Sequence, residues 1–210
     1  MKLIDIQDYL WKLKVFSIED LKMIDDKYEK SKISNWKKNW YIKQIIRWYY
    51  LFSDININEK LLFMISNKIY FPSYISLESA FSFYWLIPEK TFVITWISTK
   101  KTNYFTTDFW TFDYKKIKST LFWWYNIEKI KDNKILIASL EKAILDYFYL
   151  YDNISTLEDI KYLRWNKDIL QEKLDINILK KCGTALHSKV INYRIDLLIK
   201  YISNDWYGKN

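Results

Sequence analysis

The sequence predicts a mixed α+β protein in two parts, with helices at both ends of the chain and strands in the middle. Apolar residues recur at helical spacing in Leu3–Lys12 and again in Leu140–Leu150. Between these segments, runs such as Thr91–Ser98 have the alternating or β-branched character of strands. Half of the 210 residues are hydrophobic, which is enough to bury a core.

Three helices and a hairpin are predicted at the N-terminus. The helices cover roughly 3–13, 18–25 and 29–39, and Ser17 with Asp20 forms a capping box for the second. Two strands follow, Tyr41–Ile46 and Trp48–Phe52, with Arg47 between them. This order is typical of a winged helix-turn-helix. The second helix then supports the third in the major groove of DNA, and the hairpin contacts the backbone or minor groove.

The third helix and the hairpin are strongly basic. Lys27 to Arg47 holds six lysines and one arginine against one glutamate, a net charge of +6. Ile33, Trp36 and Trp40 recur at i, i+3 and i+7 and are expected to face inward. The DNA-binding residues we predict are Lys30, Lys32, Ser34, Asn35, Lys37, Lys38, Lys43 and Arg47. The alternative is a solvated basic helix packed on a hairpin.

Composition narrows the function classes. A net charge of +8 and a pI near 9.2 favour an anionic partner, either nucleic acid, a membrane surface or an acidic protein. There is no run of 18 apolar residues and no secretory signal at the N-terminus. With only Cys182 and His187, no internal disulfide and no cysteine or histidine metal cluster can form. We therefore expect a cytoplasmic protein without a metal or cofactor.

Residues 1–54 are predicted to form the DNA-binding domain and 55–210 a C-terminal α+β domain. Asn58 is expected to cap a helix over Glu59–Lys68, and Ser76 a helix over Leu77–Tyr84. Further strands are expected at Tyr104–Thr107, Phe109–Tyr114, Tyr125–Ile130 and Lys134–Ile137, and a hairpin turn at Asp132-Asn133. Further helices are expected at Thr156–Arg164, Lys167–Glu172, Ile176–Lys181 and Leu186–Ser203.

Three motifs stand out in the C-terminal part: PSYISLESAFSFYWLIPE, the TxxSTKK pattern of Thr95–Lys101, and ASLEKAILDYFYL from Ala138 to Leu150. They resemble the AbiEi-type antitoxins of type IV abortive-infection toxin–antitoxin systems, and the similarity runs from about Phe16 to Arg164. The resemblance implies a winged helix that binds inverted repeats near its own promoter. It also implies a C-terminal domain needed for antitoxicity and a nucleotidyltransferase-like toxin as partner. The motif residues that it singles out are Ser76, Glu78, Ser79, Pro88, Glu89, Lys100, Glu141, Lys142 and Asp146.

Tryptophan stands where the resemblance has glycine. Glycine occurs twice, against about fifteen at ordinary usage, whereas tryptophan occurs eleven times. The five positions are Trp40, Trp48, Trp85, Trp110 and Trp124. Helix ends, turns and bulges there favour positive φ or a missing Cβ. One hypothesis is that UGA codons of this gene are read as glycine, and the alternative is a drifted sequence with true tryptophans.

The acidic residues of the motifs do not form a recognisable catalytic set. Glu141 and Asp146 are five residues apart and do not share a helix face, and Glu89-Lys90 has the wrong spacing for a nuclease. Ser98–Lys101 lacks a glycine-rich phosphate loop. We therefore expect a DNA-binding autorepressor and antitoxin that is not an enzyme. Two alternatives stay open: a winged-helix regulator without a toxin, and a nucleic-acid-processing enzyme or RNA-binding protein.

Overall fold

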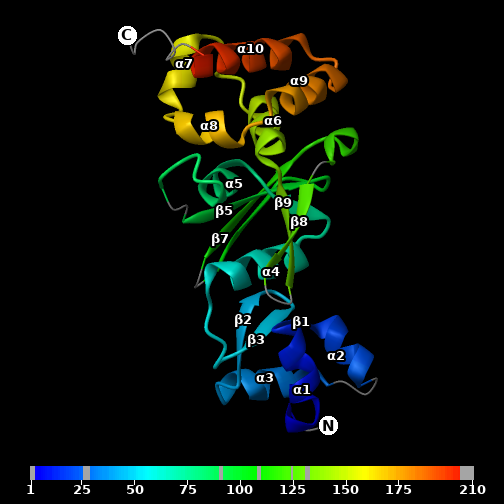
Figure 1. Ribbon diagram of the computed structural model, residues 1–210. Coiled ribbons are helices and arrows are strands. Elements are labelled where there is room, and N and C mark those ends of the chain that lie inside the picture. The colour runs from blue at the N-terminus through cyan, green and yellow to red at the C-terminus, as the bar shows by residue number, and fades with distance from the viewer. Residues whose placement is uncertain are drawn as a thin grey trace.

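A computed structural model describes residues 3–25, 29–89, 92–107, 110–123, 125–130 and 133–203. It is a mixed α+β structure with one three-stranded and one six-stranded sheet, which confirms the mixed α+β part of the predicted fold class. We call residues 3–52 the N-terminal unit and residues 59–203 the C-terminal unit. The N-terminal unit lies at one end of an elongated molecule and the last four helices at the other (Figure 1).

The N-terminal unit contains three helices and the small sheet. Its elements are α1 (Leu3–Leu13), β1 (Val15–Ser17), α2 (Ile18–Ile24), α3 (Lys30–Lys38), β2 (Ile42–Ile46) and β3 (Tyr49–Phe52). The sheet order is β1-β3-β2, with both pairings antiparallel. The predicted capping box is present, because the Ser17 and Asp20 side chains each accept the other's backbone N–H.

Both faces of the small sheet are buried. On one face, strand residues such as Phe16 and Tyr50 pack with the apolar sides of α1, α2 and α3 in a separate core. On the other face, Val15, Ile45 and Leu51 belong to the core of the C-terminal unit. Successive strand residues point to opposite faces, so neighbours in the sequence enter different cores. The small sheet is therefore the layer through which the two units meet.

The C-terminal unit is built on the large sheet, with strand order β6-β7-β5-β4-β9-β8. Its first part comprises α4 (Glu59–Ile69), β4 (Ser73–Ile75), α5 (Leu77–Phe83), β5 (Val93–Ser98), β6 (Asn103–Thr106), β7 (Thr111–Lys116), a 3₁₀ turn (Ser119–Leu121), β8 (Tyr125–Ile130), β9 (Asn133–Ala138) and α6 (Leu140–Leu150). β5 pairs with β7 and β4 with β9 in parallel, and the other pairings are antiparallel. The helix α4 lies between the two sheets (Figure 1).

Four helices complete the C-terminal unit: α7 (Leu157–Tyr162), α8 (Lys167–Lys173), α9 (Ile176–Ala185) and α10 (Lys189–Ser203). The buried guanidinium of Arg194 ties α10 to the end of α6. It donates to the backbone carbonyls of Phe148, Tyr151, Asp152 and Ile154. These include carbonyls of the last turn of α6, which have no partner within the helix. In the described part of the chain, no helix is long and apolar enough to cross a membrane.

Most expected elements are present, with ends shifted by a few residues. The expected strand at Phe109–Tyr114 is displaced to Thr111–Lys116, and the helix expected from Leu186 begins at Lys189. The strands at Val15–Ser17 and Ser73–Ile75 were missed, since each has three residues and depends on partners far along the chain. Of the predicted turn, Asp132 lies outside the described residues and Asn133 belongs to β9.

Candidate nucleic-acid interface

Helix α3 is positioned by two buried residues on its inner side. Ile33 and Trp36 are packed into the core of the N-terminal unit, as predicted. The prediction for Trp40 is wrong, because it is 77% exposed. It lies just past the helix end with φ of 58°, so its side chain leaves the helical face. The Tyr41 N–H donates to the Trp36 carbonyl, and the Trp40 N–H donates to the Lys37 carbonyl. These two hydrogen bonds form a Schellman motif at the helix end.

The outer side of α3 is polar and basic. Ser34, Asn35, Lys37 and Lys38 are exposed, as predicted. The Asn39 amide donates to the Asn35 side chain and carbonyl, both at 2.9 Å, so the Asn35 carboxamide is oriented before any partner binds. This side combines amide and hydroxyl groups with ammonium groups, the mixture that contacts base edges and phosphates.

Lys32, another of the predicted DNA-binding residues, is less exposed than these four side chains. It is half-buried, with its Nζ 3.8 Å from the carboxylate of Asp25, which follows α2. Its charge therefore faces back along α2 rather than fully outward. The side chain of Lys30 lies outside the described residues.

The β2–β3 hairpin lies beside α3 and extends its basic surface. Arg47 is exposed at the hairpin turn, with its guanidinium carbon 4.7 Å from the centre of the Trp48 ring. Lys43 lies on β2 and is half-buried. The Lys37 ammonium donates to the side-chain carbonyl of Gln44, which connects the end of α3 to β2. This link could not be predicted from the sequence, because the two residues belong to different elements.

An open groove of about 610 Å³ separates the end of α3 from the hairpin strand. Its lining residues are Lys37, Trp40, Ile42, Lys43, Gln44, Ile45 and Ile46. Its lining therefore combines two ammonium groups and one amide with the apolar side chains of Trp40 and three isoleucines.

Three of the five questioned tryptophans have a left-handed backbone. The φ values are 58° at Trp40, 76° at Trp48 and 63° at Trp85. Trp85 follows α5 in a second Schellman motif, with Leu86 N–H donating to Phe81 and Trp85 N–H to Ser82. The φ angle of Trp110 depends on Phe109, which lies outside the described residues, as does Trp124, so the hypothesis for these two positions stays a prediction. Lys14, Leu77, Arg164 and His187 also have positive φ, so this conformation is not confined to tryptophan.

Part of the C-terminal motif set forms one buried polar network. Ser76 and Tyr74 donate to the Asp146 carboxylate at 2.8 and 2.9 Å, and Lys142 forms an ion pair with its other oxygen. Ser76 was predicted to cap α5 with its side chain. The prediction is wrong, because the Ser76 hydroxyl makes no capping hydrogen bond and donates to Asp146 instead. Burial lowers the pKa of Lys142 and raises the pKa of Asp146, and each charge opposes the other's shift. This network is too enclosed to meet a macromolecule and links β4 to α6.

The remaining motif residues are dispersed. Ser79 exchanges two hydrogen bonds with Thr95, and Glu141 accepts from the backbone N–H of Asp175 at 2.9 Å. Burial raises the pKa of Glu78, and the nearby Asp113 charge adds to the shift. Pro88, Glu89 and Lys100 are exposed. Within the described ranges, no three or more His, Cys, Asp or Glu side chains gather as a metal site requires.

Comparison with known proteins gives no match, either to a model of a known protein family or to a curated protein.

Proposed function

We propose that this protein is a DNA-binding autorepressor and the antitoxin of a type IV toxin–antitoxin system. In this proposal the N-terminal unit is a winged helix-turn-helix that binds inverted repeats at its own promoter. The C-terminal unit neutralises a nucleotidyltransferase-like toxin. The first half of the proposal is supported by geometry and charge, and the second half by the motif resemblance.

The observation that carries DNA binding is the exposed side of α3 beside the Arg47 hairpin. The element order of the N-terminal unit is helix, strand, helix, helix, strand, strand, the order of a winged helix. Ser34, Asn35 and Lys38 are then available to a major groove. Arg47 at the turn is available to the adjacent backbone or minor groove.

Antitoxicity is assigned to the C-terminal unit because it carries the three motifs. The Ser76–Asp146–Lys142 network gives part of that resemblance a physical meaning, since these residues hold β4 against α6. Their role is to keep the unit folded, and contact with a toxin is left to exposed residues such as Glu89 and Lys100.

DNA binding is tested with the full chain and the DNA upstream of its own gene. Mobility shifts should show tighter binding to that fragment than to a shuffled fragment of equal length and composition. Equal affinity for both fragments, or no shift of either, would contradict autorepression. Duplex RNA of matched length serves as a competitor, and preferential binding to RNA would favour the RNA-binding alternative.

Antitoxicity is tested by expressing the chain with a nucleotidyltransferase-like reading frame adjacent to its gene. Growth arrest by the second protein alone, relieved by the full chain, is the expected result. A gene without such a neighbour, or an arrest that the chain does not relieve, would favour a regulator with no toxin partner.

A further inference from the structure

The two units meet through an apolar contact. Val15, Ile45 and Leu51 bring the second face of the small sheet into the core of the C-terminal unit. Burial of apolar surface is favourable but has no preferred direction. Directional contacts can add to this packing and select a single angle between the two units.

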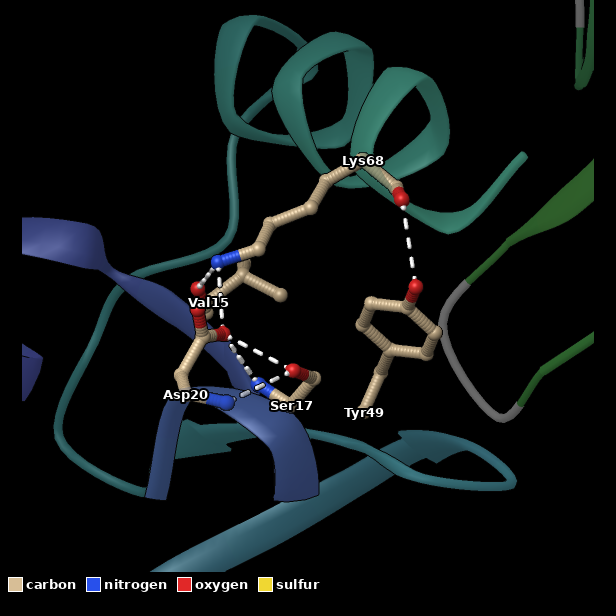
Figure 2. A network of polar contacts seen from close by, with 5 residues as sticks. All are labelled: Val15, Ser17, Asp20, Tyr49 and Lys68. Atoms are coloured by element: carbon tan, nitrogen blue, oxygen red, sulfur yellow. Dashed lines mark hydrogen bonds and ion pairs between the residues drawn. The ribbon is translucent and has the colours of Figure 1, made fainter. Parts of the chain in front are cut away.

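A polar network at the edge of this contact supplies them (Figure 2). From the last turn of α4, the Lys68 ammonium donates to the Val15 carbonyl at 2.9 Å and to the Asp20 carboxylate at 2.8 Å. The Tyr49 hydroxyl donates to the Lys68 carbonyl at 3.3 Å. One residue of the C-terminal unit is thus held by β1, α2 and β3.

The Asp20 carboxylate is held in place by Ser17 independently of Lys68. The same oxygen accepts from the Ser17 backbone N–H at 2.6 Å and from the Ser17 hydroxyl at 3.0 Å (Figure 2). In return, the Asp20 N–H donates to the Ser17 hydroxyl at 3.1 Å. A capping box at the start of α2 therefore holds the acceptor in place, and a hydrogen bond between two charged groups is shorter and stronger than one between neutral groups.

We propose that Lys68 is a positioning residue that fixes the N-terminal unit, and with it α3, at one orientation on the C-terminal unit. We call Lys68, Val15, Asp20 and Tyr49 the Lys68 latch. The proposal concerns orientation and does not depend on what α3 binds. One consequence rests on the proposed function: a repressor that reads paired half-sites must hold its recognition helices at a fixed spacing.

Orientation is measured as a distance between two spin labels, on Met23→Cys in α2 and Tyr162→Cys at the end of α7. Both positions are well exposed, at 82% and 80%. The native Cys182 is buried, and burial raises the pKa of its thiol to about 12, so it does not compete for label. The unaltered latch should give one narrow distance distribution.

Lys68→Met is the test variant and Lys115→Met its matched control. Lys115 also forms a partly exposed ion pair within the C-terminal unit, at 3.1 Å from Asp113, and the two lysine side chains are 35% and 32% exposed. Lys68→Met should broaden or shift the distribution, whereas Lys115→Met should not. Lys68→Arg, which restores a cationic donor, should keep it narrow.

Asp20→Asn tests the charge of the same contact, because the amide oxygen can still accept from Ser17 and from the Lys68 ammonium. It should broaden the distribution less than Lys68→Met does, and combining the two should add little more. Circular dichroism confirms that each variant is folded. A folded Lys68→Met protein with the unaltered distribution would overturn the proposal, and so would equal broadening by Lys115→Met.

Mobility shifts on paired and single half-sites test the consequence for DNA. Lys68→Met should weaken binding to the inverted repeat by roughly tenfold, which corresponds to about 1.4 kcal/mol, and change single half-site binding less. If the chain binds no DNA, the proposed function fails while the distance measurement still decides the latch. If it binds the inverted repeat unchanged although the distribution broadens, the latch stands but does not control recognition.

Discussion

Lys38 and Arg47 of the N-terminal unit stand at the surface, whereas Lys142 and Asp146 of the C-terminal unit are each only 2% exposed. The first pair is available to an external anion. The second pair is enclosed and shares its hydrogen bonds with Ser76 and Tyr74. The charged residues predicted to be functional therefore fall into two groups with different roles. Those on α3 and the hairpin are suited to binding, and those on α6 hold the fold together.

The largest expected effect comes from breaking the buried pair. Asp146→Ala leaves the Lys142 charge buried and unpaired, which should lower the free energy of unfolding by about 3–5 kcal/mol. The double variant Lys142→Met with Asp146→Leu should cost less, because no buried charge remains. Denaturant unfolding followed by circular dichroism measures both. A double variant less stable than the single one would show that the pair does more than neutralise itself.

The same comparison predicts a small effect at the surface. Replacing Lys38 and Arg47 with alanine should change the free energy of unfolding by no more than about 0.5 kcal/mol for each residue, since both are exposed. A loss as large as that expected for Asp146→Ala would place these residues among the groups that stabilise the fold.

The tryptophans also fall into two groups, those with a left-handed backbone and those buried in a core. Trp40, Trp48 and Trp85 have a left-handed backbone that disfavours bulky L-residues, so glycine at each should raise stability by about 1–2 kcal/mol. The matched control is Trp36, whose buried ring should cost about 3–5 kcal/mol when truncated to alanine.

Mass spectrometry of the native protein separates recoding from true tryptophan. Tryptic peptides across Trp48 and Trp85 should carry glycine masses if UGA is read as glycine in this gene. Tryptophan masses at both positions would end that hypothesis. The strain would then be a real property of the protein, to be offset by its packing.

The smallest expected effect is on the stability of the protein at acidic pH. Burial raises the pKa of Asp20, but hydrogen bonds from Lys68 and Ser17 outweigh it and leave the pKa below its ordinary value of 3.8. A carboxylate whose pKa is lower in the folded than in the unfolded state stabilises the folded state at pH values above the unfolded pKa. That contribution is lost as the pH falls through the folded value, here below about pH 4.

Lys68→Met should reduce this acid sensitivity, because Asp20 then keeps only its Ser17 contacts. The free energy of unfolding, followed from about pH 5 to about pH 2, should fall less steeply in the variant than in the parent protein. Identical curves would show that Lys68 does not stabilise the Asp20 carboxylate.

Local signals in the sequence predicted the helices of the N-terminal unit and its hairpin. The capping box at Ser17 and the cap at Asn58 were confirmed, since each depends on residues three positions apart. The left-handed backbone at Trp48 and Trp85 could also be predicted, because a hairpin turn and a helix end impose it locally.

Contacts between distant segments could not be predicted. Lys68 lies 48 residues from Asp20, and Tyr74 lies 72 residues from Asp146, so no spacing rule relates them. The ion pair of Lys32 with Asp25 could not be predicted either, because Asp25 lies beyond the end of another helix. Much of the candidate interface could therefore be predicted from local sequence patterns. The Lys68 latch and the buried network could not, because they depend on tertiary packing.

The most direct test of the account is the salt dependence of DNA binding by the full chain. Lys38→Ala with Arg47→Ala is compared with Lys180→Ala and Lys181→Ala, two exposed lysines on α9. The first double variant should bind every duplex more weakly and flatten the log–log salt slope by about two, roughly one unit for each lost phosphate contact. The second should behave as the parent protein. Unchanged affinity and slope in the Lys38 and Arg47 variant would contradict the assignment of α3 and its hairpin as the DNA-binding surface.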